Sequence, residues 1–216
     1  MGNIKAVIFD LDGTLIDTER LYRINWPKAM AHFGYEMTDE QALAIRSLGR
    51  PYAPVQFKEW FGEDFDYFEV REYRKQLMRE DLAKEGIKLK PGAVEILEYL
   101  RDNGIVTAMA TANGKDRTER YLAELGLRDH FDKVICADMV EHGKPAPDIY
   151  AYACQQLGFE PSECMAVEDS PNGVTSAYKA GCKVVYVPDQ SPLDDTVAPM
   201  LYSCQETLFG IKELVY

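Results

Sequence analysis

Short apolar runs recur along the chain, separated by segments in which apolar residues repeat at three- and four-residue steps. The repeats at Val94, Leu97 and Leu100, followed by Gly104, are typical of a helix and its end. Strand–helix alternation predicts an α/β fold, a Rossmann-like, doubly wound parallel sheet with helices on both faces. Five runs have the length and composition of strands buried on both sides: Ala6-Phe9, Val106-Ala110, Val134-Ala137, Met165-Val167 and Val184-Val187.

One long stretch departs from this alternation. Residues 17–87 contain no run typical of a strand, and their apolar and aromatic residues follow helical steps, interrupted at Gly34, Gly49-Arg50-Pro51 and Gly62. The α/β pattern returns at Lys90. The sequence therefore predicts an α/β core made of residues 1–16 and 88–216, with an inserted α-helical cap domain at 17–87.

The amino-acid composition argues against some classes of binding partner. The chain has 216 residues and a formal net charge of −12, which argues against nucleic acid or an anionic membrane because both require basic surfaces. No segment has the apolar length of a transmembrane helix. The 5 cysteines contain no C-x-x-C pair, so we expect free thiols in a cytoplasmic protein. The 3 histidines lack the spacing of zinc ligands.

Two carboxylates directly follow the first predicted strand. Alternation along an extended chain places Asp10 and Asp12 on the same side, and Gly13 allows the chain to turn. Reactive groups of open α/β sheets collect beyond the carboxyl ends of strands. Two neighbouring carboxylates require a cation or a shared proton, and oxygen ligands favour Mg²⁺ over zinc. The alternative is an acidic turn that caps a helix.

Three further polar segments follow other predicted strands. Thr111-Ala112-Asn113-Gly114 leads into a helix, where a hydroxyl and free N–H groups make either an anion site or an ordinary N-cap. Lys144 lies between Gly143 and Pro145, either as a fixed point charge or as a solvated loop lysine. Glu168 and Asp169 bring two more acids to the end of the fourth strand, although Asp169 could simply cap the next helix.

These four segments, in this order, resemble the haloacid dehalogenase-like hydrolase superfamily over essentially the whole chain. The similarity is greatest to the branch with a helical cap after the first strand, which includes phosphoglycolate and sugar-phosphate phosphatases and β-phosphoglucomutases. The resemblance implies an enzyme that forms an aspartyl-phosphate on Asp10, with Asp12 as general acid and base. It also implies that Thr111 holds the phosphate and that Lys144 neutralises the nucleophile and the phosphate.

The resemblance further implies a Mg²⁺ site and substrate contacts. The family metal is held by Asp10, the backbone carbonyl of Asp12, Asp169 and, directly or through water, Glu168. We expect substrate contacts from Thr14, Ala112, Asn113 and Arg50, the last in the loop Arg46-Ser47-Leu48-Gly49-Arg50-Pro51 between cap helices. We expect a monomer that acts on a small phosphorylated metabolite.

Phosphatase and mutase remain two alternatives. Dehalogenases of this superfamily lack the second aspartate, so Asp12 favours phosphate esters. Arg50 either matches an arginine with which β-phosphoglucomutases hold a second phosphate or is a solvated arginine at a helix end. Tyr22 replaces their cap-linker histidine and favours a phosphatase. Arg74 and Lys75, on the last cap helix, either face the cleft or belong to a solvated helix face, and the solvated face is favoured. A third alternative, a non-catalytic binding protein, is disfavoured because every catalytic-type group is present. The substrate could be a sugar phosphate, phosphoglycolate, a nucleotide or a cofactor precursor.

Overall fold

A parallel sheet organises the computed structural model, which describes residues 4–215; residues 1–3 and 216 of the expected core lie outside this range. The sheet has 6 strands in the order β3-β2-β1-β4-β5-β6, and each neighbouring pair is parallel. The doubly wound fold class is thereby confirmed. The strands are β1 (Ala6–Phe9), β2 (Val106–Thr111), β3 (Lys133–Cys136), β4 (Cys164–Glu168), β5 (Lys183–Tyr186) and β6 (Leu201–Cys204).

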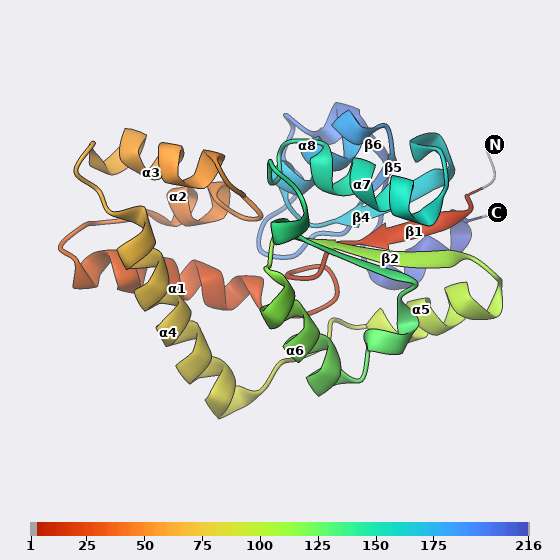
Figure 1. The fold of residues 1–216 in the computed structure, drawn as a ribbon, viewed down its shortest axis with the longest axis horizontal. Coiled ribbons are helices and arrows are strands. Elements are labelled where there is room, and N and C mark those ends of the chain that lie inside the picture. Colours follow the sequence, from red (N-terminus) through yellow and green to blue (C-terminus); the bar gives the residue numbers. More distant parts are fainter. Residues whose placement is uncertain (1–3, 216) are drawn as a thin grey trace.

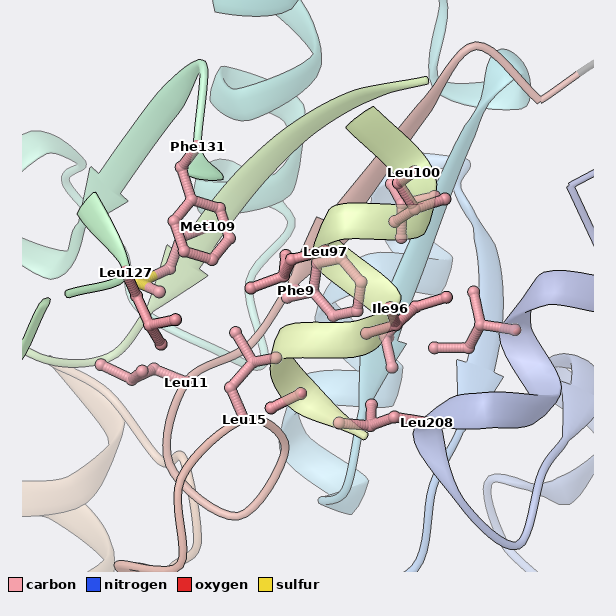
Figure 2. Packing of buried hydrophobic residues seen from close by; sticks show 14 of the residues in the cluster. Phe9, Leu11, Leu15, Ile96, Leu97, Leu100, Met109, Leu127, Phe131 and Leu208 are labelled. Atoms are coloured by element: carbon pink, nitrogen blue, oxygen red, sulfur yellow. The ribbon is translucent and has the colours of Figure 1, made fainter. Parts of the chain in front are cut away.

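Helices cover both faces of this sheet, as the pattern predicts (Figure 1). Along β1, Val7 and Phe9 point into the apolar cluster that contains the residues of α5 and α6, whereas Ala6 and Ile8 point into the cluster of α7 and α8. Figure 2 shows Phe9 packed beside Ile96 of α5. These four helices are α5 (Ala93–Asp102), α6 (Lys115–Leu125), α7 (Asp148–Leu157) and α8 (Pro171–Ala180).

The strand order reverses between β1 and β4, which lie side by side at the centre of the sheet. Ligands of open α/β sheets bind in the crevice at such a reversal, beyond the carboxyl ends of the strands. Asp10 follows β1, Asp169 follows β4, and Thr111 is the last residue of β2. The topology therefore brings these three residues to one edge of the sheet, although they are far apart in sequence.

Four helices lie between β1 and α5 in sequence and to one side of the sheet in space (Figure 1). They enclose an apolar cluster of their own, which includes Met30, Phe57 and Val70. The two segments that connect them to the sheet hydrogen-bond to each other, Asp17 N to Lys88 O at 2.8 Å. The helices are α1 (Glu19–His32), α2 (Asp39–Ala44), α3 (Tyr52–Phe61) and α4 (Tyr67–Glu85).

Short elements complete the fold. The described part of the chain contains five 3₁₀ turns, at Arg128–His130, Ala137–Met139, Pro161–Glu163, Ala198–Met200 and Leu208–Glu213. Within residues 4–215, no helix combines the length and the apolar character needed to cross a membrane.

Candidate active site

Lys144 lies at the centre of the carboxylate cluster. Its Nζ donates to Asp10 Oδ1 at 2.5 Å and to Glu168 Oε1 at 2.6 Å, and the residue is 1% exposed. Burial alone would lower the pKa of Lys144, but the negative charges of Asp10 and Glu168 outweigh burial and raise it. Lys144 is therefore a fixed cation, and the alternative of a solvated loop lysine is wrong.

Glu168 is held by protein donors on both of its oxygens. Tyr150 OH donates to Oε1 at 2.6 Å, and Ser170 Oγ donates to Oε2 at 3.3 Å. A Cβ at position 173, in the first turn of α8, would lie 2.0 Å from this carboxylate, so only Gly173 leaves room for it. Tyr150 was not identified from the sequence, because its aromatic ring fits the apolar pattern of α7 equally well.

Three acids have a geometry that fits a metal ion. Asp10, Glu168 and Asp169 each offer a ligand oxygen within 4.8 Å of the others. Oδ2 of Asp10 and Oδ2 of Asp169 are buried and have no hydrogen-bond partner in the described part of the chain. Burial raises the pKa of Asp10 to about 8, although Lys144 opposes the shift, and burial also raises the pKa of Asp169. A bound cation would compensate these buried carboxylates, so the residues fit a hard divalent metal.

Thr14 and Gly13 support Asp169. The hydroxyl of Thr14 donates to Asp169 Oδ1 at 3.4 Å and is fully buried. Gly13 has φ +84°, and a Cβ there would lie 2.4 Å from Asp169 Oδ2. Thr14 is not among the described residues that line the cleft. Thr14 thus contacts the metal cluster, and its expected contact with the substrate stays a prediction.

Asp12 has surroundings quite different from those of Asp10. Thr18 Oγ1 donates to Asp12 Oδ1 at 2.5 Å, and Asn113 Nδ2 donates to Asp12 Oδ2 at 2.5 Å. Burial raises the pKa of Asp12, and these two hydrogen bonds oppose the shift. The Asp12 carboxylate is not part of the three-acid group among the described residues, which leaves the predicted backbone-carbonyl contact to the metal as a prediction.

Thr18 is a contributor that sequence reasoning missed. It occupies the N-cap position of α1, yet its side chain makes no capping hydrogen bond within the described structure. A threonine at this position ordinarily accepts a hydrogen bond from the first helical turn. Here its hydroxyl is directed to Asp12 instead, so a residue that looks like a cap holds a carboxylate.

The segment after β2 combines structural and cleft-lining residues. Asn113 N donates to Thr111 Oγ1 at 3.1 Å, and Thr111 is fully buried. Ala112 and Asn113 line the cleft. At the start of α6, Lys115 N already donates to Asp138 Oδ2 at 3.0 Å. The backbone groups left for a phosphate are thus those nearer Ala112.

A cleft of about 350 Å³ lies between the strand ends and the inserted helices. Asp10 and Asp12 line it from the sheet, and the loop from Arg46 to Arg50 lines it from the insert. Arg50 is exposed, and its backbone oxygen accepts a hydrogen bond from Gly143 N at 2.7 Å.

The same loop contacts the core closely. Gly49 N donates to Lys144 O at 2.8 Å, and a Cβ on Gly49 would lie 2.7 Å from Gly143 Cα. Arg46 is buried, with Nη1 3.7 Å from Asp169 Oδ2 and Nη2 donating to Ser191 at 2.6 Å. The insert therefore supplies a guanidinium next to the metal cluster, which the sequence analysis did not anticipate.

Tyr22 connects the insert to Asp12. Its hydroxyl donates to Asn113 Oδ1 at 3.4 Å and accepts from Arg117 Nη1 at 2.8 Å. Burial raises the pKa of Tyr22, and the nearby charge of Asp12 raises it further. Tyr22 is thus a neutral hydrogen-bonding group at physiological pH, in agreement with its expected inability to carry protons.

Arg74 and Lys75, for which a solvated face was favoured, differ in burial and in their position relative to the cleft. Arg74 is 4% exposed and lines the cleft, so its expected place on a solvated face is wrong. Lys75 pairs with Glu72 on the same helix and is not among the described cleft-lining residues.

Comparison with known proteins agrees with this geometry. The family model described as haloacid dehalogenase-like hydrolase matches residues 4–181. The chain is 30% identical to phosphorylated carbohydrates phosphatase of Thermotoga maritima, over 98% of this chain and 100% of that protein. It is 31% identical to hexitol phosphatase A of Escherichia coli, over 94% and 92%.

A solved structure is also similar over most of the chain. CbbY of Rhodobacter sphaeroides, a D10N mutant in complex with xylulose-1,5-bisphosphate, superposes with a TM-score of 0.79 and 25% identity, over 95% of each chain. Family model, curated relatives and solved structure all cover most of the chain. The chain thus belongs to the haloacid dehalogenase-like hydrolases.

Proposed function

We propose that this protein is a Mg²⁺-dependent phosphatase that hydrolyses a small phosphomonoester through an aspartyl-phosphate on Asp10. The observation that carries the proposal is the contrast between two neighbouring carboxylates. Asp10 is ion-paired to Lys144 and belongs to the group that fits a metal ion, and both cations would favour its anionic form against burial. Asp12 is held by the neutral donors Thr18 and Asn113. Two carboxyl groups in such different environments can take different roles in one reaction.

In the first step, Asp10 attacks phosphorus and the bond between phosphorus and the ester oxygen breaks. Asp12, whose pKa is raised by burial, gives its proton to the departing oxygen and becomes a carboxylate. In the second step, Asp12 takes a proton from water as that water attacks the aspartyl-phosphate. Inorganic phosphate leaves, and Asp10 is regenerated. Positioned proton transfer of this kind is worth about 10²–10⁴-fold in rate.

The remaining groups stabilise charge and align the phosphate. Asp10, Asp169 and Glu168 would hold Mg²⁺, which when bound supplies positive charge to the phosphoryl oxygens. Lys144 neutralises Asp10, and Thr111 with the backbone near Ala112 and Asn113 orients the phosphate. Because phosphoryl transfer depends mainly on alignment and charge stabilisation, this set suffices for the chemistry.

We propose that residues 17–87 act as the cap that selects the substrate, on a core of residues 1–16 and 88–216. Their separate apolar cluster and the two hydrogen-bonded connecting segments support this division. A sugar phosphate or a similar metabolite is the substrate class that the relatives named above favour.

The mutase is the competing function, and Arg50 in the cleft lining is the observation in its favour. A mutase must protect its aspartyl-phosphate from water until a second sugar phosphate arrives. Tyr22 stands where mutases carry a histidine, and it cannot shuttle protons because its pKa is raised. Asp12 is therefore free to activate water.

One incubation separates the two functions. The enzyme is supplied with β-glucose 1-phosphate, Mg²⁺ and a trace of the 1,6-bisphosphate, and a panel of other monoesters is tested alongside. Release of inorganic phosphate that stops on chelation supports the phosphatase. Glucose 6-phosphate formed with almost no free phosphate would overturn it.

A further inference from the structure

The wall of the cleft formed by the inserted helices holds a buried guanidinium for which the described part of the chain offers no counter-ion. The guanidinium carbon of Arg74 lies 4.7 Å from the ring centroid of Tyr22 and 4.9 Å from that of Trp26. Its Nη1 donates to the sulfur of Met78 at 3.0 Å, a weak acceptor. Its Nε is buried and has no hydrogen-bond partner among residues 4–215.

This arrangement is costly in the free protein. Buried charges in folded proteins are normally paired, because removing a charge from water costs several kcal/mol. Burial lowers the pKa of Arg74, Tyr22 and Tyr67 oppose the shift, and the neighbouring Arg117 and Arg71 add to it. No carboxylate of the described residues lies within ion-pair distance of Arg74 to offset the cost.

The unpaired group lies close to the reacting centre. Tyr22, whose ring lies under Arg74, reaches Asn113 through its hydroxyl, and Asn113 holds Asp12 at 2.5 Å. Arg117 donates to the same hydroxyl at 2.8 Å. One small molecule with its phosphate at Asp10 could therefore reach both arginines. Arg50 also lines the cleft, but it is exposed.

We infer that Arg74 and Arg117, joined by Tyr22, form a subsite for a second anionic group on the substrate. The substrate is then a phosphomonoester whose other end carries a phosphate or a carboxylate. A planar guanidinium donates two parallel hydrogen bonds to either group, which gives both charge pairing and orientation. This inference rests on the proposed phosphatase function and specifies its substrate class.

Matched substrate pairs test the subsite. The phosphate arm compares fructose 1-phosphate with fructose 1,6-bisphosphate, and the carboxylate arm compares glucose 6-phosphate with 6-phosphogluconate. In at least one arm, the wild type should prefer the doubly anionic member in kcat/KM, and Arg74→Gln should reduce that preference by about 30-fold or more. Arg79→Gln, an exposed position on the same helix, should retain it. No preference in either arm, or the same preference after Arg74→Gln, would overturn the inference.

Binding separates failure of the subsite from failure of the proposed function. If the wild type hydrolyses no member of the panel, the phosphatase proposal has failed. Calorimetry of the same four compounds with Asp10→Asn, and with Asp10→Asn combined with Arg74→Gln, still measures the subsite. Tighter binding of a doubly anionic compound that is lost in the double variant supports the inference, and equal binding contradicts it.

A thermal melt distinguishes a ligand-binding arginine from a structural one. Arg74→Met removes an unpaired buried charge and retains apolar contact with Tyr22 and Trp26, so the ligand-free protein should melt at the same or a higher temperature. A large loss of stability with an unchanged substrate preference would show that Arg74 only supports the fold.

Discussion

The two sides of the cleft differ in how their buried charged groups are paired. On the sheet side, Lys144 is paired with Asp10 and Glu168, and each oxygen of Asp12 has a donor. On the side of the insert, Arg74 is buried with an unpartnered Nε. The open oxygens on the sheet side, Oδ2 of Asp10 and Oδ2 of Asp169, belong to the group that fits a metal ion. The sheet side therefore fixes the groups that are needed for every phosphoryl transfer, whereas the unpartnered group on the insert leaves a place for the part of the substrate that differs between enzymes.

The strongest test of the sheet side is the nucleophile. Asp10→Asn preserves shape but removes the negative charge that attacks phosphorus, so turnover should fall to the background rate. Phosphate release measures the loss, and circular dichroism shows whether the fold is retained. Asp102→Asn, a largely exposed aspartate on α5, is the control and should behave as wild type. Turnover of Asp10→Asn near the wild-type rate would refute its assignment.

The hydrogen bond from Thr18 to Asp12 can be removed without changing the carboxylate itself. Thr18→Val should lower kcat for a sugar phosphate by about 10²-fold, because Asp12 loses orientation as a general acid. The loss should be smaller for 4-nitrophenyl phosphate, whose leaving group needs little protonation. Thr175→Val, which removes a hydroxyl bonded to Pro171 O at 2.8 Å, is the control. Equal losses on both substrates would argue against a role for Thr18 in proton transfer.

The contact between the two sides is tested at Gly49. A methyl group there would lie 2.7 Å from Gly143 Cα, so Gly49→Ala should push the loop away from Lys144. We expect kcat/KM to fall by about 10-fold, equivalent to about 1.4 kcal/mol. Gly143→Ala should act in the same way, and the double variant should lose less than the two losses combined. Strictly additive losses would mean that the two glycines act independently.

The metal site is tested through stability and not through rate. Mg²⁺ at about 100 times its Kd should stabilise the protein by about 2.7 kcal/mol, which corresponds to a rise of several degrees in the thermal midpoint. Asp169→Asn should remove most of this rise, because one ligand whose Oδ2 accepts no hydrogen bond is lost. Calorimetry with and without chelator measures it. An unchanged midpoint in the wild type would contradict a Mg²⁺ site.

The sheet side could be predicted from sequence much better than the insert. Asp10 and Asp169 directly follow buried strands, and parallel strands end at one edge, so their proximity follows from topology. The sixth strand, Leu201–Cys204, was missed because it lies at the sheet edge and its residues are only half-buried or exposed. Its polar residues resemble those of a loop.

The sequence contains a signal for the burial of Arg74 that was misinterpreted. On α4, the buried residues Tyr67, Val70, Arg74 and Met78 are separated by three or four positions, so Arg74 lies on the apolar face. The charge of Arg74 suggested a solvent-exposed side chain, whereas its spacing from the other buried residues of α4 indicates that it is buried. The direction of the Thr18 hydroxyl could not be predicted, because helix capping explains a threonine there equally well.

The central place of β1 has a consequence for synthesis on the ribosome. Its residue Ala6 pairs with Val106 of β2 and with Cys164 of β4, both made much later. At about 5–20 residues per second, the apolar strand waits on the order of ten seconds or more for its second neighbour. During translation this segment is therefore exposed without its sheet partners, and a chaperone that binds short apolar peptides would find its earliest target there.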